Sequence, residues 1–477
     1  MTRLDIFLSQ IDQILFPITS RKSAITISAI IIILLSLILF SVRQNILTYN
    51  KTLETVYFIL TVVIGYGIGS WFLLGYVKQT TRSTTAATTT TISPKVQRSL
   101  LIRSLDLAVV LVQYAMLGIM LFVIFNRSSE FLMSYVNAIT SVFATIIMTA
   151  FAFRILWWYK KGDRRLLVLL YFLTALSIAI MVAVDFGVKF MITTRVEVSA
   201  PEAISQEKFL YKNTPEGLLL KQDIEPESTI SYIVPLLFVT AWRVLNIYPG
   251  LVSLYLRWGA TSLTLHEYNK TKRLNKTIFW ILISIPVILL FIGQLPDYLG
   301  ITPEPWTRPV FRGANIAIGI LFGLAFLVMA RKAPQVKDNM TIAAIGVMII
   351  TISFAITNLQ QTFGIAAHSL ILLSSYLFAI GLYESVVSLS HDAALRLSIR
   401  RSAKGAIPNL LDSASLAEMQ QHIEQRVMKI AKDQSNVLFE QSGVRPSLEE
   451  ADMKEYLKQV LIEIGKDRNV AVGDKKA

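Results

Sequence analysis

The chain has 477 residues, of which 53% are hydrophobic and only 16% are charged, and its mean hydropathy is +0.55. Soluble globular proteins carry about 25% charged residues, so this composition excludes a disordered chain, a soluble nucleic-acid binder and a coiled-coil rod, and it favours a polytopic membrane protein. The net charge of +14 does not indicate nucleic acid, because the basic residues lie beside apolar runs, where they orient a membrane protein.

Residues 1–23 predict an amphipathic helix at the membrane interface. Within residues 3–16 the apolar side chains recur at helical spacing: Leu4, Phe7, Leu8, Ile11, Leu15 and Phe16. Such a face can lie in the headgroup region of the inner leaflet or pack on the protein itself, and the sequence favours the first arrangement.

Ten apolar runs approach the length of roughly 20 residues that a membrane-spanning helix needs. They lie at 24–42, 56–77, 107–125, 134–158, 166–188, 230–256, 277–295, 313–330, 340–359 and 363–388. The expected fold is an all-α, polytopic transmembrane helix bundle over residues 24–388, followed by a small helical cytoplasmic tail over residues 389–477.

The distribution of Lys and Arg predicts the orientation of this bundle. With the N-terminus inside, the inside segments carry 20 basic residues and the outside segments 10, of which five lie in the long, net-acidic loop 189–229. Both termini are therefore expected in the cytoplasm, with loop 189–229 outside, in a multi-pass protein of the cell membrane. Residues 79–93, rich in Thr and Ser, are expected to form a mobile cytoplasmic loop.

Polar side chains within the predicted spans are candidate site residues, because burying them in lipid is costly and usually serves function. Arg243 lies 13 residues into the sixth span, about 20 Å at 1.5 Å per residue and so near the bilayer middle. The other candidates are Gln113, Asn137, Asp185, Asn246, His368 and Glu384. Two interpretations of Arg243 stay open: a substrate or gating charge, or an arginine held by carbonyls and amides.

Glycine and proline indicate where helices approach closely or bend. Two pairs in the G-x-x-x-G pattern allow close helix contact: Gly65 with Gly69 and Gly319 with Gly323. Prolines are expected to bend the sixth and seventh spans: Pro235, Pro249 and Pro286.

The tail predicts two amphipathic helices, arranged as an antiparallel hairpin. Ser415 with Glu418 resembles a capping box, and Ser447 with Glu450 repeats it; each precedes an apolar stripe at helical spacing. These stripes need a partner, which the sequence leaves open: each other, a second copy, or the cytoplasmic loops.

Between the tenth span and this hairpin, the sequence predicts a basic helix beside anionic lipid. Its lipid-facing residues would be Arg396, Arg400, Arg401 and Lys404. The preceding Ser390-His391-Asp392 superficially resembles the phospho-acceptor box of sensor histidine kinases. The family's Arg-Thr-Pro continuation is missing, and only 86 residues follow His391, so the structural interpretation is favoured.

The residues give little support for enzyme chemistry. Cysteine is absent and histidine occurs four times, so no metal site, cofactor or catalytic residue is expected. His266-Glu267 begins like a zinc-protease motif, but residue 270 is Lys where the second ligand would stand, and no phosphate-binding loop of the GxxxxGK[ST] type occurs.

The ten-span layout and two tail segments resemble uncharacterised archaeal multispanning membrane proteins. The segments are Leu410-Leu411-Asp412 and Ile423-Glu424-Gln425-Arg426-Val427. This resemblance implies a membrane helix bundle and carries over no functional residue, because no motif of a characterised family is matched.

Two functions are compatible with these patterns. The first is a receptor or signalling scaffold that couples the membrane domain to the tail; its partners would be the lipid bilayer and, through residues 389–477, a cytoplasmic protein or a second copy, with no nucleic acid. The alternative is a secondary transporter or channel for a small solute such as an anion, for which Arg243 would be the binding charge.

Overall fold

The computed structural model describes residues 20–43, 56–57, 59–86, 100–126, 130–161, 166–193, 211–214, 217–223, 229–234, 236–269, 276–299, 307–332, 336–357, 361–410, 416–442, 448 and 450–473. The predicted amphipathic helix at residues 3–16 lies outside these residues. The described chain is overwhelmingly helical, and helical structure overlaps each of the ten predicted spans.

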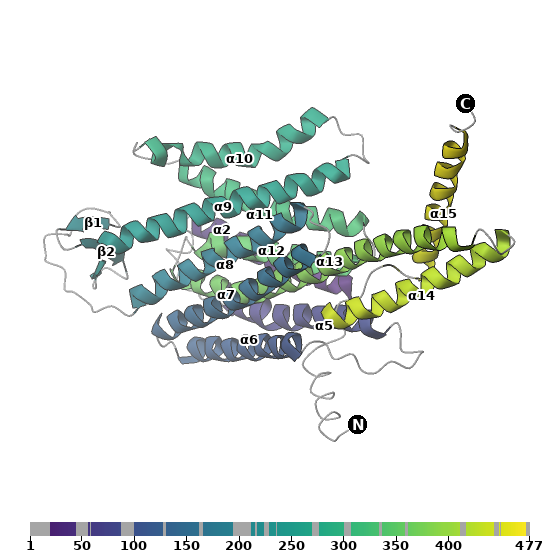
Figure 1. Ribbon diagram of the computed structural model, residues 1–477. Coiled ribbons are helices and arrows are strands. Elements are labelled where there is room, and N and C mark those ends of the chain that lie inside the picture. The colour runs from purple at the N-terminus through teal and green to yellow at the C-terminus, as the bar shows by residue number, and fades with distance from the viewer. Residues whose placement is uncertain are drawn as a thin grey trace, which may run out of the picture.

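The helices form one elongated bundle with a tail that leaves it at one end (Figure 1). In chain order they are α2 (Arg21–Arg43), the π-helix η1 (Thr61–Gly69), α5 (Ser70–Ala86), α6 (Leu100–Asn126), α7 (Glu130–Lys161), α8 (Leu166–Thr193), α9 (Leu236–Asn269), α10 (Lys276–Leu299), α11 (Thr307–Lys332), α12 (Lys337–Thr357), α13 (Gln361–Leu410), α14 (Leu416–Ser442) and α15 (Glu450–Gly473). The predicted mobile loop at residues 79–93 is thus helical as far as Ala86.

Five helices in the described part of the chain are long and apolar enough to cross a membrane. Their spans are Ala138–Lys160, Leu166–Val184, Gly313–Arg331, Lys337–Ala355 and Leu370–Ala403. Two shorter apolar helical segments accompany them, Leu107–Phe122 and Phe279–Gly293. These helices support a membrane protein, and the full set of ten spans stays a prediction.

Helix α13 forms the centre of the bundle, where every residue from 370 to 388 is buried. Its backbone lies directly against that of α12, because two glycines remove the side chains between them. A Cβ atom on Gly381 would lie 2.5 Å from the backbone nitrogen of Ala343, and one on Gly346 would lie 2.7 Å from the carbonyl oxygen of Ser374. Such contacts join membrane helices through backbone-to-backbone packing.

The predicted glycine pair on α11 has the expected role. A Cβ atom on Gly323 would lie 2.6 Å from Cγ of Met348, and one on Gly319 would lie 2.7 Å from Cβ of Thr351, so α11 packs closely on α12. In the other pair, Gly69 lies against Ile31 of α2, whereas Gly65 makes only ordinary contact with α13. The pattern therefore predicted three of four close approaches.

A small antiparallel sheet separates α8 from α9, and the sequence did not predict it. Its strands are β1 (Tyr211–Thr214), β2 (Gly217–Asp223) and β3 (Thr229–Val234), with Leu218 opposite Val234. The membrane bundle is all-α as expected, but the sixth predicted span begins as β3, and its helix starts at Leu236. The β-branched and aromatic side chains of residues 230–234 favour a strand, and Pro235 biases the preceding residue toward extended backbone.

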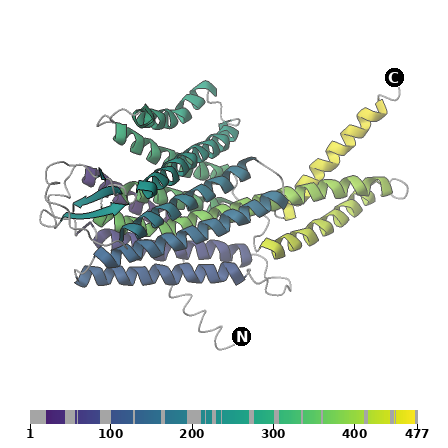
Figure 2. The same cartoon turned by 60° about the vertical axis from the view of Figure 1, so that its left-hand side comes forward.

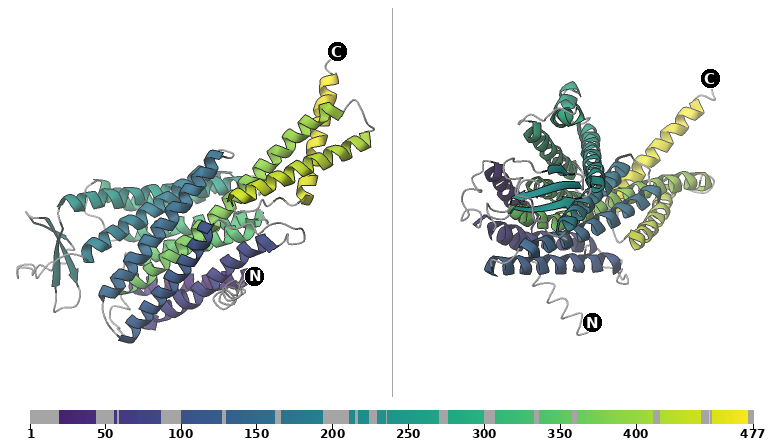
Figure 3. Two further views of the ribbon diagram at one scale, coloured as in Figure 1. Left: turned by 60° about the horizontal axis from the view of Figure 1, so that its bottom comes forward. Right: turned by 90° about the vertical axis from the view of Figure 1, so that its left-hand side faces the viewer.

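Two helices follow α13 in the tail, and both lie beside the part of α13 that extends beyond the bundle (Figures 2 and 3). The predicted antiparallel hairpin between them does not form. α13 continues beyond the bundle without interruption, α14 turns back along it, and α15 crosses this pair (Figure 3). The helices α14 and α15 pack mainly on α13 rather than on each other. The tail is thus a three-helix unit whose first member is the extension of the tenth predicted span.

Candidate functional site

Most of the predicted intramembrane residues lie on described helices, but their side chains fall outside the described part of the chain. These are Arg243 and Asn246 on α9, Asn137 on α7, Asp185 on α8 and His368 on α13. Two others are described. Gln113 is buried on α6 and donates from Nε2 to Oγ of Ser70 at 3.1 Å, while Glu384 is buried on α13 beside Tyr383.

Aromatic contacts hold α7 against α13. The ring of Phe151 meets that of Tyr383 with centroids 5.4 Å apart, and the guanidinium carbon of Arg154 lies 5.7 Å from the centre of the same tyrosine ring. Two turns further along α13, the ring of His391 packs edge-on against Trp158 at 4.9 Å. A cation over an aromatic ring is attracted by the ring quadrupole, so Arg154 adds an electrostatic contact to this packing.

His391 is 0% exposed, enclosed between helices rather than presented to solvent. A phospho-acceptor histidine must meet a phosphoryl donor, and a ring packed on Trp158 offers no approach for one. The structural interpretation of Ser390-His391-Asp392 therefore agrees with the placement of these side chains.

The next residue, Asp392, joins α13 to the start of α15. Its Oδ1 accepts a hydrogen bond from the backbone N–H of Leu448 at 3.1 Å, and both groups are buried. Further along α13, Arg400 forms an ion pair with Glu463 at 2.7 Å, and the guanidinium of Arg396 lies 5.5 Å from the ring centre of Tyr456.

These contacts give the basic helix a protein partner, α15, that the sequence did not predict, and its contact with lipid stays a prediction. Arg396 and Arg400 contact α15, while Arg401 is exposed and the Lys404 side chain lies outside the described residues. The sequence missed this arrangement because the acidic and aromatic partners lie about 60 residues away in the chain.

A buried apolar cluster, here called the tail cluster, fills the space between the three tail helices. Its members are Leu395, Ile399 and Ala403 on α13, Ile423, Val427 and Ala431 on α14, and Leu448, Met453, Leu457 and Val460 in and before α15. Full burial of a large aliphatic side chain contributes about 1.5–3 kcal/mol, so this cluster fixes the tail on α13. The stripes of α14 and α15 thus find a partner outside the three that the sequence left open, although the four-residue spacing of Leu395, Ile399 and Ala403 signalled it.

Helix α9 carries a buried polar stripe centred on Arg257, which the sequence assigned to an inner loop. Arg257 is only 5% exposed, and its Nε donates to the carbonyl oxygen of Ser253 at 3.3 Å. Thr261 and Thr264 follow on the same face, and each hydroxyl donates a hydrogen bond to the backbone carbonyl four residues earlier, at 2.7 Å. This local bonding lets the helix stay buried although its composition looks like that of a loop.

A hydrogen bond between α8 and α9 sets the depth of this stripe. The hydroxyls of Tyr171 and Thr264 lie 3.1 Å apart, and the two helices run antiparallel side by side (Figures 1 and 3). Arg257 is seven residues before Thr264 and therefore lies level with Ile178, close to the middle of the apolar span Leu166–Val184. By the same register, the backbone of Arg243 lies level with residue 192, beyond the end of that span.

A second polar cluster joins α2, α5 and α12. Arg21 donates to Oγ1 of Thr341 at 3.0 Å, and its Nε lies 3.6 Å from the carboxylate of Asp338. The hydroxyl of Tyr76 donates to the same carboxylate at 2.9 Å. Asp338 stands in the first turn of α12, where the helix dipole favours a negative charge, so this cluster ties the starts of α2 and α12 to the middle of α5.

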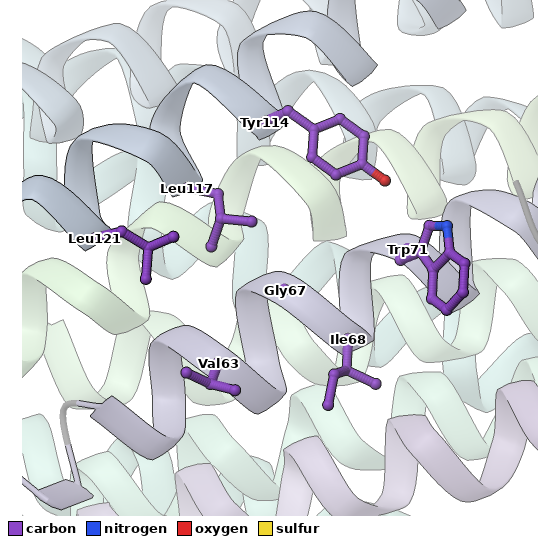
Figure 4. A pocket seen from close by; sticks show the side chains of 7 residues that line it. All are labelled: Val63, Gly67, Ile68, Trp71, Tyr114, Leu117 and Leu121. Atoms are coloured by element: carbon purple, nitrogen blue, oxygen red, sulfur yellow. The ribbon is translucent and has the colours of Figure 1, made fainter. Parts of the chain in front are cut away.

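A shallow apolar groove of about 460 Å³ lies between η1, α5 and α6 (Figure 4). Gly67 forms part of its wall, and Val63, Ile68 and Trp71 face Leu117 and Leu121 across it. Its polar groups are the phenol of Tyr114 and the indole N–H of Trp71. Such a lining suits apolar chains and provides no acid–base chemistry.

Comparisons with protein families, with curated proteins and with solved structures find no match to this chain, so no residue above receives a role by similarity.

Proposed function

We propose that this chain is an integral membrane protein that acts as a receptor or signalling scaffold, coupling its helical bundle to the tail through α13. The observation that supports this function is the continuity of α13 over 50 residues, from the buried centre of the bundle to the tail cluster. At 1.5 Å per residue this helix is about 75 Å long. The predicted orientation, with both termini in the cytoplasm, belongs to the same proposal.

The packing of α13 favours movement of the whole helix over local changes of its side chains. Because Gly381 and Gly346 bring the backbones of α12 and α13 into contact, α13 cannot yield by turning a side chain to another rotamer. Closely packed helices instead shift as units between discrete arrangements. A change in the bundle that moves α13 would therefore move its extension as well.

The far end of α13 is equally firmly attached. The tail cluster, the Asp392 hydrogen bond to Leu448 and the Arg400–Glu463 ion pair fix α14 and α15 on the extension. Movement of α13 would consequently reorient the surface that these helices present to a partner.

Hydrogen exchange on the full-length protein in lipid nanodiscs tests this coupling. Gly381→Ala disturbs α13 inside the bundle, and we expect faster amide exchange in α14 and α15, far from the substitution. Gly118→Ala is the matched control, because a Cβ atom there meets no described atom within 4 Å, and the tail should be unaffected.

A break in α13 completes the test. Ser398→Pro interrupts α13 between Leu395 and Ile399 of the tail cluster, whereas Ser398→Ala does not. Added to Gly381→Ala, the proline should weaken the response of the tail to the bundle substitution, while the Asp392 hydrogen bond to Leu448 still links α15 to the part of α13 before the break. If Gly381→Ala in the unbroken helix did not change the amide exchange of α14 and α15, the proposal would be contradicted.

A secondary transporter or channel for a small anion is the second candidate, and it is supported by the buried Arg257 rather than by Arg243. Uptake of radiolabelled anions into proteoliposomes tests it, with Arg257→Gln as the variant and Arg243→Gln as the control on the same helix. Uptake that survives Arg257→Gln would remove this support.

A further inference from the structure

We infer that the contact between α8 and α9 is a binding site for a small monovalent anion, with Arg257 as its central cation. The guanidinium stays protonated in proteins and offers five N–H donors. Within the described residues, its hydrogen bond is the one from Nε to the Ser253 carbonyl, and no described carboxylate forms an ion pair with it. A positive charge level with the middle of an apolar span is costly unless a negative charge offsets it.

Buried hydroxyl groups lie within about one helical turn of the level of this charge on both helices. Thr174 on α8 and Ser253 on α9 are each 0% exposed, and neither hydroxyl has a hydrogen-bond partner among the described residues. The register set by Tyr171 and Thr264 places Thr174 level with Thr261, one turn from Arg257. Buried hydroxyls that lack a partner are costly, and an anion beside Arg257 would accept their hydrogen bonds.

The acid nearest in sequence on α8 does not lie opposite Arg257. Asp185 follows Ile178 by seven residues, a displacement of about 10 Å along the helix at 1.5 Å per residue. The charge and the buried hydroxyl donors together form the proposed site.

The inference does not depend on the coupling function, because binding can be measured whatever the tail does. The purified full-length protein is heated in detergent at constant ionic strength, while chloride or formate replaces the bulky anion gluconate. We expect the unfolding temperature to rise with the concentration of either small anion. Arg257→Gln should abolish this dependence, whereas Arg243→Gln should retain it.

Two milder variants keep the test decisive if Arg257→Gln does not fold. Thr174→Val and Ser253→Ala each remove one hydroxyl and leave the charge in place, and each should raise the anion concentration needed for half the effect several-fold. Anion dependence that is unchanged in both variants would overturn the inference. A wild-type protein without anion dependence would overturn it as well. Asp185 would then be the partner of Arg257 if Asp185→Asn and Arg257→Gln each lowered the stability by the same amount and their effects did not add.

Discussion

The carboxylate of Asp392 accepts a hydrogen bond from the backbone N–H of Leu448, which follows 56 residues later in the chain. The bond links α13, where it leaves the bundle, directly to the residue that precedes α15, and it is buried between these two helices. Because it is buried, this bond contributes more to stability than the exposed contacts nearby. An N–H group without a partner is costly only where water cannot replace the partner.

Replacing Asp392 by Ala should loosen α15 while leaving the bundle intact. The buried N–H of Leu448 would lose its acceptor, which costs about 1–3 kcal/mol. Limited proteolysis and amide exchange in residues 450–473 should both become faster. Glu463→Gln is the control, because exposed ion pairs such as Arg400–Glu463 contribute only about 0–1 kcal/mol. Equal effects of the two substitutions would show that Asp392 does not hold α15.

Replacing Gly346 by Ala should destabilise the bundle itself. The added methyl group would meet the carbonyl oxygen of Ser374 and the backbone of Phe378, which cannot move without shifting α13. Overpacking of this kind costs about 1–3 kcal/mol. Thermal unfolding in detergent measures the loss, and Gly118→Ala, which adds the same group where no described atom lies close, should be neutral or slightly stabilising.

Replacing Tyr76 by Phe should weaken the junction of α2, α5 and α12. The substitution removes the hydroxyl that donates to Asp338, at a cost of about 1.5–3 kcal/mol for a hydrogen bond to a charged group. Tyr114→Phe on the neighbouring helix α6 should change stability less, because its hydroxyl forms no hydrogen bond found in the described residues. Denaturant unfolding of both variants compares them, and the reverse order would refute this role of Tyr76.

Accessibility in intact cells tests the predicted orientation. A protease site at residue 210, in the loop that the basic residues place outside, should be cut without permeabilisation. A tag at residue 477 should react only after permeabilisation. Reversed accessibility would invert the orientation, and two sites on one side would mean an odd number of spans.

Sequence reasoning predicted the helices well because long apolar runs and apolar stripes depend on local periodicity. The stripe of α14 is one example, and the glycines at 319 and 323 are another, since small residues at this spacing suit close helix contact whatever the neighbour is. These features need no knowledge of the rest of the chain.

Features that depend on distant neighbours were missed. Arg257 follows directly after an apolar run and counted as an inner-loop charge, whereas packing on α8 extends the buried part of α9 beyond it. The signal was present in Ser253, Thr261 and Thr264, which recur at helical spacing around it. The strand β3 was taken as helix because a short apolar run does not distinguish the two structures.

The continuity of α13 has a geometric consequence for the tail. Gly381, fixed against α12, is 29 residues from the end of the helix at Leu410, a distance of about 44 Å at 1.5 Å per residue. A tilt of about 7° about this fixed point would swing the far end through about 5 Å, close to the 5.4 Å pitch of an α-helix. The extension would thus act as a lever arm, and a rearrangement too small to open the bundle could still carry α14 past a bound partner by one full turn.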